Sequence, residues 1–566
     1  MDHSALQKTC VHCNQLFSVT AEDRSFLEKF APTISGKSYE LPLPTRCPSC
    51  RQQRRLAWRN ERNLYQDQCD RCGKGMISLY NPEAPYPVYC QDCWWSDSWD
   101  PLAYGTTVDF SRPFFEQYRE LQLVVPRLAL FNIHSENSIY TNHSSNNKNC
   151  YMGVAFGDCE DCLYGHWVLH SRNVVDGLYL EHCEHCYECS YCQHCYQAYW
   201  CVHCAQVRDS LLCYECRNCE YCIGCVQLQH KRYQVLNESV SKAAFDSFRR
   251  EILTSREKFA EVYQAYRRLK LTRPHRATLQ INCENCMGDD LYNSRNSMHC
   301  FNCRELDDCR YMYDLGNNKS SMDCYEHGWL VQSELIYESH AGMAGYRFIG
   351  CNTCADSNHL MYSDLCFNNC AHLFGCIGLK KKEHCILNRE YSEREYETLV
   401  AQLIERMTTD HEWGEFFPGK YSPFGYNESV ASEYHPLTEK VAIEQGFSYS
   451  TWHPAEPHPS EILDAEQLPT DIANASDKLL QSAIRCRVSK KPYRITKQEL
   501  AFYRTHQLPP PEKHPDVRHA ERMRLRNPRT FSDRRCEKCG KEITSTFSLQ
   551  ANEIVYCDDC YRSEIY

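Results

Sequence analysis

The cysteines in the middle of this 566-residue chain keep a common phase. Fifteen of them lie between residues 150 and 225, and every one occupies a position divisible by three. A longer spacing of 21 residues also recurs, for example from Cys162 to Cys183 and on to Cys204. Independent metal-binding knuckles have no reason to keep phase over this length, whereas equal, stacked turns of chain do. The pattern therefore predicts a β-solenoid with about 21 residues per coil.

A second cysteine-rich region spans residues 283–385, where Cys303 and Cys324 keep the spacing of 21. Each region is followed by a predicted helix. An apolar stripe of helical period runs over residues 245–266, and a capping box begins at Ser392. These helices are expected to cover strand edges that otherwise stay unpaired.

Two interpretations remain open for the central cysteines. Free cysteine is small and apolar, so the side chains can stack as buried ladders, which is the favoured interpretation. Alternatively, CxxC pairs from adjacent coils hold metal ions, and the run from Cys183 to Cys195 is the best candidate. Isolated Cys486 is expected to be a core residue.

The two ends of the chain carry cysteines at metal-ligand spacing. Two sets share the pattern CxxC-x17-CxxC at an offset of 467 residues: Cys69, Cys72, Cys90 and Cys93, and Cys536, Cys539, Cys557 and Cys560. Two such turns brought together complete the tetrahedral four-thiolate site that structural Zn²⁺ prefers. Each set predicts a zinc ribbon, with residues 76–80 and 87–89 as the strands of the first.

A third set precedes the first ribbon and consists of Cys10, Cys13, Cys47 and Cys50. Pro48 and the residues after it predict a helix that starts at this point, because proline suits the first helical position. A helix start also favours thiolate charge. This set predicts a treble-clef finger, so the chain is expected to bind at least three Zn²⁺.

A decayed copy of this finger is predicted near the C-terminus, in residues 476–530. Two of its four ligand positions hold Cys486 and His514, and the other two hold Ser489 and Val517. Two ligands are too few to close a structural site. We expect a metal-free copy held together by its hydrophobic residues.

The net charge of −11 is unevenly distributed: residues 46–62 and 513–535 each carry +5, and residues 150–225 carry −7. An arginine stripe on a zinc-anchored helix can bind phosphates. The candidate nucleic-acid contacts are Arg51, Arg54, Arg55, Arg59, Arg62, Arg518, Arg522, Arg526 and Arg529. The alternative is a solvated face, or one docked onto the acidic solenoid of the same chain.

No catalytic residue is predicted. The chain has no HExxH, P-loop or nucleophile-elbow motif, and a site closed by four thiolates leaves no position for water. No secretory signal and no apolar stretch of about 18 residues is present, which predicts a cytoplasmic protein with reduced thiols and no membrane contact.

The stretch from Cys10 through Phe17 to the Arg46-Cys47-Pro48-Ser49-Cys50-Arg51 segment resembles a zinc-ribbon family found in many bacterial proteins of unknown role. The full arrangement, with Val-Tyr-Cys-x-x-Cys ribbons at both ends, looks like a group of uncharacterised cysteine-rich proteins from candidate-phyla bacteria. This resemblance covers most of the chain and implies no activity. The decayed finger departs from the four-ligand pattern.

The predicted fold is mainly β with flanking helices, and treble-clef and zinc-ribbon modules frame two cysteine-rich β-solenoid segments. The expected order is a treble clef at 1–63, a ribbon at 64–105, a linking helix at 106–131, a solenoid at 132–240, a helix at 241–277, a second solenoid at 278–391, a helix and irregular connector at 392–475, the degenerate treble clef at 476–530 and a ribbon at 531–566.

The favoured function is a non-enzymatic multi-zinc scaffold whose Arg-rich finger helices contact RNA, DNA or a ribosome-like particle. One alternative is a protein-interaction scaffold without nucleic acid. The other is a metal-storage or redox protein that uses the central thiols.

Overall fold

The computed structural model describes residues 5–327, 331–452 and 462–565. The chain forms two compact units, each assembled from two separate stretches of sequence. Unit 1 comprises residues 1–130 and 278–452, and unit 2 comprises residues 131–277 and 453–566. The cysteine pairs of the chain ends therefore belong to different units. They precede the large sheet of unit 1 in the sequence and follow the sheets of unit 2.

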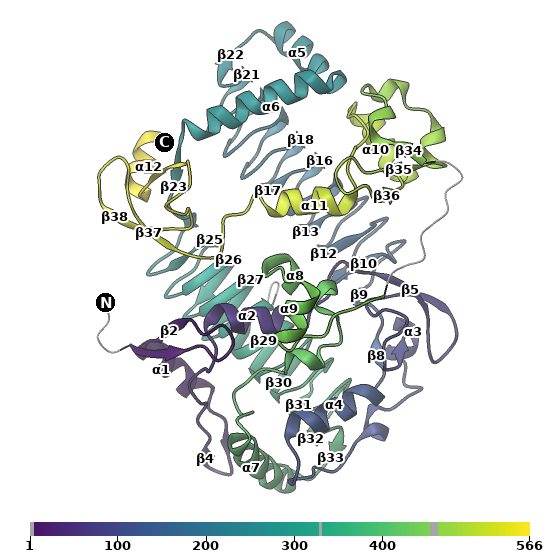
Figure 1. Ribbon diagram of the computed structural model, residues 1–566, viewed down its shortest axis with the longest axis vertical. Helices are drawn as coiled ribbons and strands as arrows, with labels where there is room; N and C mark the ends of the chain where they lie inside the picture. Colours follow the sequence, from purple (N-terminus) through teal and green to yellow (C-terminus); the bar gives the residue numbers. More distant parts are fainter. Residues whose placement is uncertain (1–4, 328–330, 453–461, 566) are drawn as a thin grey trace. The chain divides into compact units, whose positions relative to one another are not determined.

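Unit 2 is built on two seven-stranded sheets whose strands are parallel except for the last pair, β21 and β22 (Figure 1). The first sheet consists of β9 (Asn132–Ile133), β10 (Thr141–Asn142), β11 (Ser144–Ser145), β12 (Gly153–Gly157), β13 (His166–Leu169), β15 (Leu178–Glu181) and β17 (Ser190–Gln193). The second consists of β14 (Arg172–Val175), β16 (Glu184–Tyr187), β18 (Tyr196–Tyr199), β19 (Arg208–Leu211), β20 (Glu220–Ile223), β21 (Arg232–Val235) and β22 (Glu238–Ser239).

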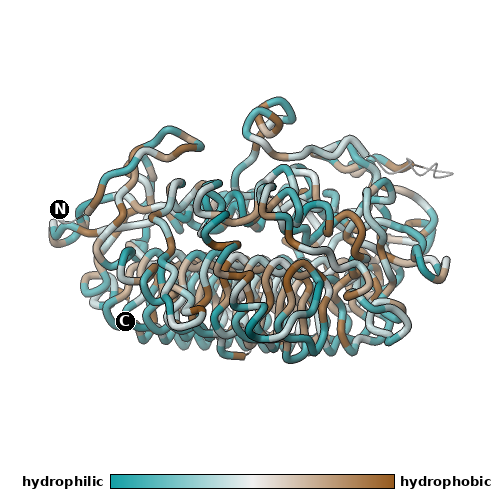
Figure 2. Tube along the Cα trace, turned by 90° about the horizontal axis from the view of Figure 1, so that it is seen from below, coloured by the Kyte–Doolittle hydropathy of each residue, from teal (hydrophilic) through white to brown (hydrophobic). Residues whose placement is uncertain are grey.

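The structural repeat of these sheets is 12 residues, so the predicted period of 21 is wrong. Val154 pairs with His166, and His166 pairs with Leu178. Figure 2 shows the resulting evenly spaced turns of the Cα trace. The three-residue phase has a local cause: every third residue from Asn146 to Tyr221 has a positive φ. The residue after each of these corners belongs to the interior, at a position divisible by three. Both 12 and 21 are multiples of three, so cysteine phase alone could not separate them.

The interior thiols serve as hydrogen-bond donors to the backbone. The Sγ of Cys183 lies 3.4 Å from the carbonyl oxygens of both Glu181 and Cys192. One repeat earlier, Ser171 occupies the same position, donates to the Leu169 carbonyl at 2.7 Å and accepts from the Cys183 N–H at 3.0 Å. An interior position therefore requires a small side chain that can donate a hydrogen bond.

Cys183→Ser is expected to change the free energy of unfolding by less than about 1 kcal/mol, because serine can make the same bond. Cys183→Leu is expected to cost about 1–3 kcal/mol, because the interior has no room for the added volume. Urea unfolding of the full chain measures both. A serine variant as unstable as the leucine variant would refute the donor role.

Unit 1 contains one ten-stranded sheet, parallel except for its last pair, β32 and β33. Its strands are β24 (Gln280–Ile281), β25 (Met287–Tyr292), β26 (Met298–Asp307), β27 (Arg310–Lys319), β28 (Met322–His327), β29 (Ser333–Ile349), β30 (Ala355–Met361), β31 (Ala371–Phe374), β32 (Glu383–Ile386) and β33 (Arg389–Glu390).

The repeat of 12 residues is less regular in unit 1, which accounts for its less regular cysteine pattern. Strands β28 and β29 pair at an offset of 15, and β30 and β31 at an offset of 13. Cys303 lies opposite Leu315, and Cys324 lies opposite Met312 and Ser339. The spacing of 21 between these two cysteines therefore pairs nothing.

The helices beside the sheets begin largely where the sequence indicates. Helix α7 (Glu393–Thr409) starts at the capping box of Ser392, as predicted. The apolar stripe over residues 245–266 forms two helices instead of one, α5 (Lys242–Thr254) and α6 (Arg256–Leu271), because Ser255 ends the first and caps the second. Within the described residues, no helix has both the length and the apolar character that crossing a membrane requires.

Candidate metal centres and the docking of their helices

Three groups of four cysteines could each hold a metal ion, and they are the three sets that the sequence predicts. In each group the four sulfur atoms lie within 4.8 Å of one another: Cys10, Cys13, Cys47 and Cys50; Cys69, Cys72, Cys90 and Cys93; and Cys536, Cys539, Cys557 and Cys560. Among the described residues, the search for three or more clustered ligands finds these groups only. The interior cysteines of the sheets are therefore not gathered in this way.

The N-terminal group joins a tight turn to the start of a helix. Cys10 and Cys13 lie between β1 (Leu6–Thr9) and β2 (Leu16–Val19), and Cys47 is the N-cap of α2 (Pro48–Leu56), as predicted. The Sγ atoms of Cys13 and Cys47 are 3.8 Å apart. Hydrogen bonds from the Cys50 thiol and backbone lower the pKa of Cys47 to about 5, which favours a thiolate.

The two ribbons are equivalent in their backbone as well as their ligands. An antiparallel hairpin of β5 (Tyr65–Gln68) and β6 (Gly75–Ser78) recurs as β37 (Ser532–Arg535) and β38 (Glu542–Ser545). In each turn a glycine, Gly73 or Gly540, takes a positive φ, which costs least without a Cβ atom. The two strands predicted for the first ribbon do not pair with each other, because β7 (Val88–Tyr89) pairs with β8 (Arg127–Leu128).

The sulfur positions of both ribbons suit a tetrahedral metal. The distances are 3.9 Å between Cys72 and Cys90 and 3.8 Å between Cys539 and Cys557. Four thiolates about 2.3 Å from one zinc ion are about 3.8 Å apart. Burial would raise the pKa of Cys69, but nearby backbone N–H groups outweigh it and lower this pKa to about 7.

The degenerate finger keeps the backbone of the complete one without its ligand set. Its elements are β35 (Ala483–Arg485), β36 (Pro492–Tyr493), α10 (Lys497–His506) and α11 (Pro515–Met523). The N–H of Cys486 donates to the Lys491 carbonyl at 3.0 Å, as that of Cys10 donates to Gln15 at 2.9 Å. His514 caps α11, where its ring accepts from the Asp516 N–H at 3.1 Å.

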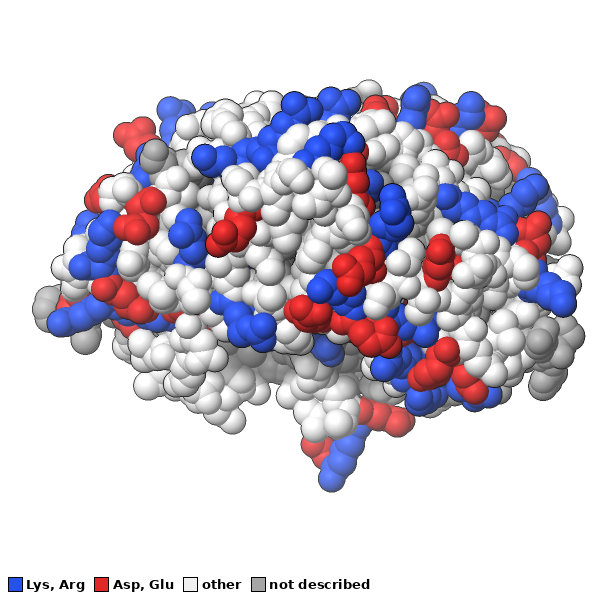
Figure 3. Space-filling model, turned by 90° about the horizontal axis from the view of Figure 1, so that it is seen from above, with Lys and Arg blue, Asp and Glu red and all other residues white. Residues whose placement is uncertain are grey.

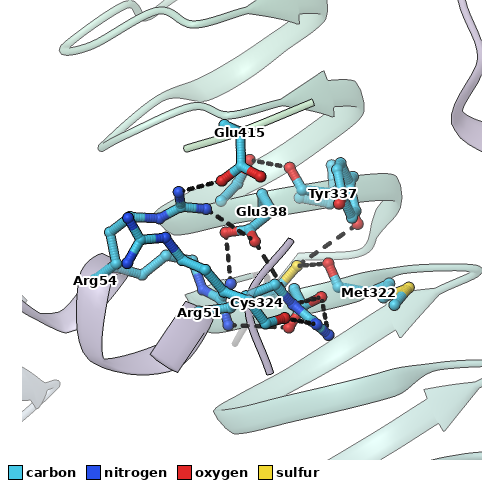
Figure 4. A network of polar contacts seen from close by, with 12 residues as sticks. Arg51, Arg54, Met322, Cys324, Tyr337, Glu338 and Glu415 are labelled. Carbon is cyan, nitrogen blue, oxygen red and sulfur yellow. Dashed lines mark hydrogen bonds and ion pairs between the residues drawn. The ribbon is translucent and has the colours of Figure 1, made fainter. Parts of the chain in front are cut away.

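In unit 1 the arginines of α2 lie against two carboxylates of the ten-stranded sheet (Figure 4). Asp323 accepts from Arg51 at 2.8 Å and from Arg55 at 3.2 Å. Glu338, on the neighbouring strand, accepts from Arg55 at 2.6 Å and from Arg54 at 3.4 Å. Burial would lower the pKa of Arg51, but the two carboxylates outweigh it and raise this pKa, so the guanidinium stays charged.

Unit 2 repeats this contact on α11. Asp176 accepts from Arg518 at 2.9 Å and from Arg522 at 2.9 Å. Glu188 accepts from Arg522 at 3.0 Å. Strands β14 and β16 pair in the register that sets these two carboxylates on neighbouring repeats, 12 residues apart. Asp176 is fully buried, and both arginines are at most 2% exposed.

We call this contact the arginine lock: two arginines one helical turn apart, paired with two carboxylates on adjacent strands. Unit 1 uses Arg51 and Arg55, and the offset of 467 residues converts them into the Arg518 and Arg522 of unit 2. The duplication therefore includes how each finger docks as well as how it folds.

The locks decide where most of the predicted nucleic-acid contacts lie. Six of the nine are at most 5% exposed and pair with carboxylates of their own unit: Arg51, Arg54, Arg55, Arg59, Arg518 and Arg522. The other three, Arg62, Arg526 and Arg529, are partly exposed. A phosphate cannot reach the buried six while the helices stay docked.

The first ribbon also docks through buried side chains of unit 1. Arg127, on the strand beside β7, donates to Asp364 of the sheet at 2.7 Å, and both are at most 1% exposed. Trp94 is fully buried with its ring against Phe367, and Lys380 donates to its carbonyl at 2.8 Å. The ribbon is therefore part of the core of its unit.

The four carboxylates of the locks are functional residues that the sequence interpretation missed individually. The acidic charge of residues 150–225 had indicated that the arginine faces could dock on the same chain. The separation of 12 between Asp176 and Glu188 was the signal that could have identified this pair. The offset of 15 between Asp323 and Glu338 hides the equivalent pair in unit 1.

Comparison with the models of known protein families finds no match for this chain, and comparison with proteins of curated function finds no relative. The resemblance to cysteine-rich proteins of candidate-phyla bacteria therefore gains no family assignment. The structure shows a cysteine-rich chain with three four-cysteine groups, one of them at the N-terminus.

Proposed function

We propose that this protein is a zinc-stabilised β-solenoid scaffold that binds another protein. The arginine lock carries the proposal, because it turns the basic finger helices inward onto carboxylates of the same unit. In this scaffold each finger or ribbon attaches to a stack of 12-residue coils. The scaffold has no catalytic role, since four thiolates leave a zinc ion no position for water.

Surface charge also favours a protein partner. On the face drawn in Figure 3, Lys and Arg side chains are interspersed with Asp and Glu. A polyphosphate backbone favours a surface of one sign, whereas protein surfaces complement each other in smaller patches.

Storage of metal by the central thiols receives less support. The cysteines of the unit 2 interior are at most 2% exposed. Each thiolate that bound a metal ion would withdraw an S–H donor from buried carbonyls, and an unsatisfied buried polar group is costly.

The purified full chain is expected to contain at least three zinc ions without added metal, one for each four-cysteine group. Elemental analysis measures this number. Cys536→Ser is expected to lower it by one, because three ligands remain at that ribbon. A value below two per chain would reject the zinc assignment.

Nucleic acid remains a second candidate partner because Arg62, Arg526 and Arg529 are partly exposed. The scaffold proposal predicts no measurable binding of RNA or DNA to the full chain at low salt. Binding that weakens with salt by a log–log slope of about −0.7 per contact would favour this second candidate. Replacing the three arginines by alanine would then flatten the slope.

A further inference from the structure

The two arginine locks differ in what holds their helices in place. The small core of the N-terminal finger consists of Cys10, Phe17, Val19 and Cys50, with Cys13, Leu43 and Cys47 packed against them. Four of these seven residues are the candidate metal ligands themselves. Little apolar packing therefore remains in this finger without a metal ion.

The degenerate finger of unit 2 has an apolar core in place of ligands. Eight of its residues belong to the same buried cluster as Tyr187, Tyr199 and Leu211 of the second sheet: Leu479, Ile484, Tyr493, Ile495, Leu500, Phe502, Tyr503 and Leu508. Hydrophobic burial can hold α11 against its sheet with no metal present.

Helix α2 cannot hold its own conformation once its start is released. It has nine residues, fewer than the roughly 12–15 that an isolated helix needs to be even marginally stable in water. Its first turn is attached to the rest of the finger through Cys47 and Cys50. In small zinc domains the free energy of metal binding is the free energy of folding.

The arginine lock does not compensate for this loss. Each ion pair in it is almost fully buried, so the attraction between the charges is largely offset by the cost of removing them from water. Ordering an unfolded nine-residue segment to form the lock adds conformational entropy to that cost. The lock positions a helix that is already folded.

We propose that unit 1 contains a zinc-responsive latch. Loss of zinc from Cys10, Cys13, Cys47 and Cys50 releases α2 from Asp323 and Glu338, whereas α11 stays docked in unit 2. Release exposes the segment 46–62, which carries six arginines and one glutamate. This latch rests on the proposed function in one respect, namely that the N-terminal group binds zinc.

Hydrogen exchange of the full chain, with and without a zinc chelator, tests the latch. Each unit has one ribbon, so chelation removes ribbon zinc from both, and only the first finger differs. Protection in residues 48–56 is expected to fall about 100-fold or more, while residues 515–523 keep theirs. Equal loss of protection in both helices, or no loss in α2, would overturn the proposal.

The double variant Cys13→Ser with Cys50→Ser separates the finger from the ribbons. It is expected to contain one zinc fewer than the parent chain and to lose protection in α2 alone. Unit 2 in the same molecule reports whether the variant folds. A parent chain without zinc contradicts the proposed function, whereas a zinc-depleted variant with α2 still protected contradicts only the latch.

Discussion

Replacing Arg55 by alanine is expected to destabilise unit 1 by about 3–5 kcal/mol, the usual cost of removing one partner from a buried ion pair. Arg55 is fully buried and is the one arginine of α2 that contacts both Asp323 and Glu338 among the ion pairs of the described chain. Its loss leaves two buried carboxylates with less compensation. Urea unfolding of the full chain, followed by hydrogen exchange in unit 1, measures the effect.

Arg62→Ala is the matched control, because Arg62 belongs to the same basic segment and is partly exposed. It is expected to change stability by less than about 0.5 kcal/mol. Arg522→Ala tests the equivalent position of unit 2, where a similar loss is expected. If Arg55→Ala costs no more than Arg62→Ala, the lock contributes nothing to stability.

Restoring the degenerate finger is expected to create a fourth metal site. The double variant Ser489→Cys with Val517→Cys would combine with Cys486 and His514 to give three thiolates and one imidazole, a common structural zinc set. The backbone around Cys486 already matches that around Cys10, with N–H···O distances of 3.0 Å and 2.9 Å. The zinc content is expected to rise by one per chain.

Elemental analysis measures that increase, and thermal unfolding with and without a chelator measures the accompanying stabilisation of unit 2. Ser489→Cys alone provides only three ligands and should bind no additional structural zinc. A double variant with unchanged zinc content would show that the degenerate finger no longer keeps the geometry of the complete one.

The local features were predictable because neighbouring residues determine them. Cys47 and Pro48 specify the start of α2, and Ser392 specifies the start of α7, as the structure confirms. Ligand spacing likewise identified all three four-cysteine groups. The 12-residue repeat was missed because the cysteine phase records only that every third residue faces inward, not how many corners complete a turn.

The docking of the fingers could not be predicted in the same way. Arg51 and Asp323 are 272 residues apart, and both sheets offer a stacked pair of carboxylates at the required spacing. The acidic region nearer to the N-terminal finger in the sequence, residues 150–225, belongs to unit 2. Only the fold shows that this finger docks on the later sheet, since the sequence records charge without recording which sheet receives it.

A ribosome completes the N-terminal finger long before the carboxylates on which it docks. Arg55 and Glu338 are 283 residues apart, which corresponds to roughly 15–60 s of translation at about 5–20 residues per second. During that interval a bound ion is the main support for α2. The C-terminal finger emerges 334 residues after Glu188, when its sheet is already complete. The order of synthesis thus gives a reason why the first finger keeps four ligands and the second has lost two.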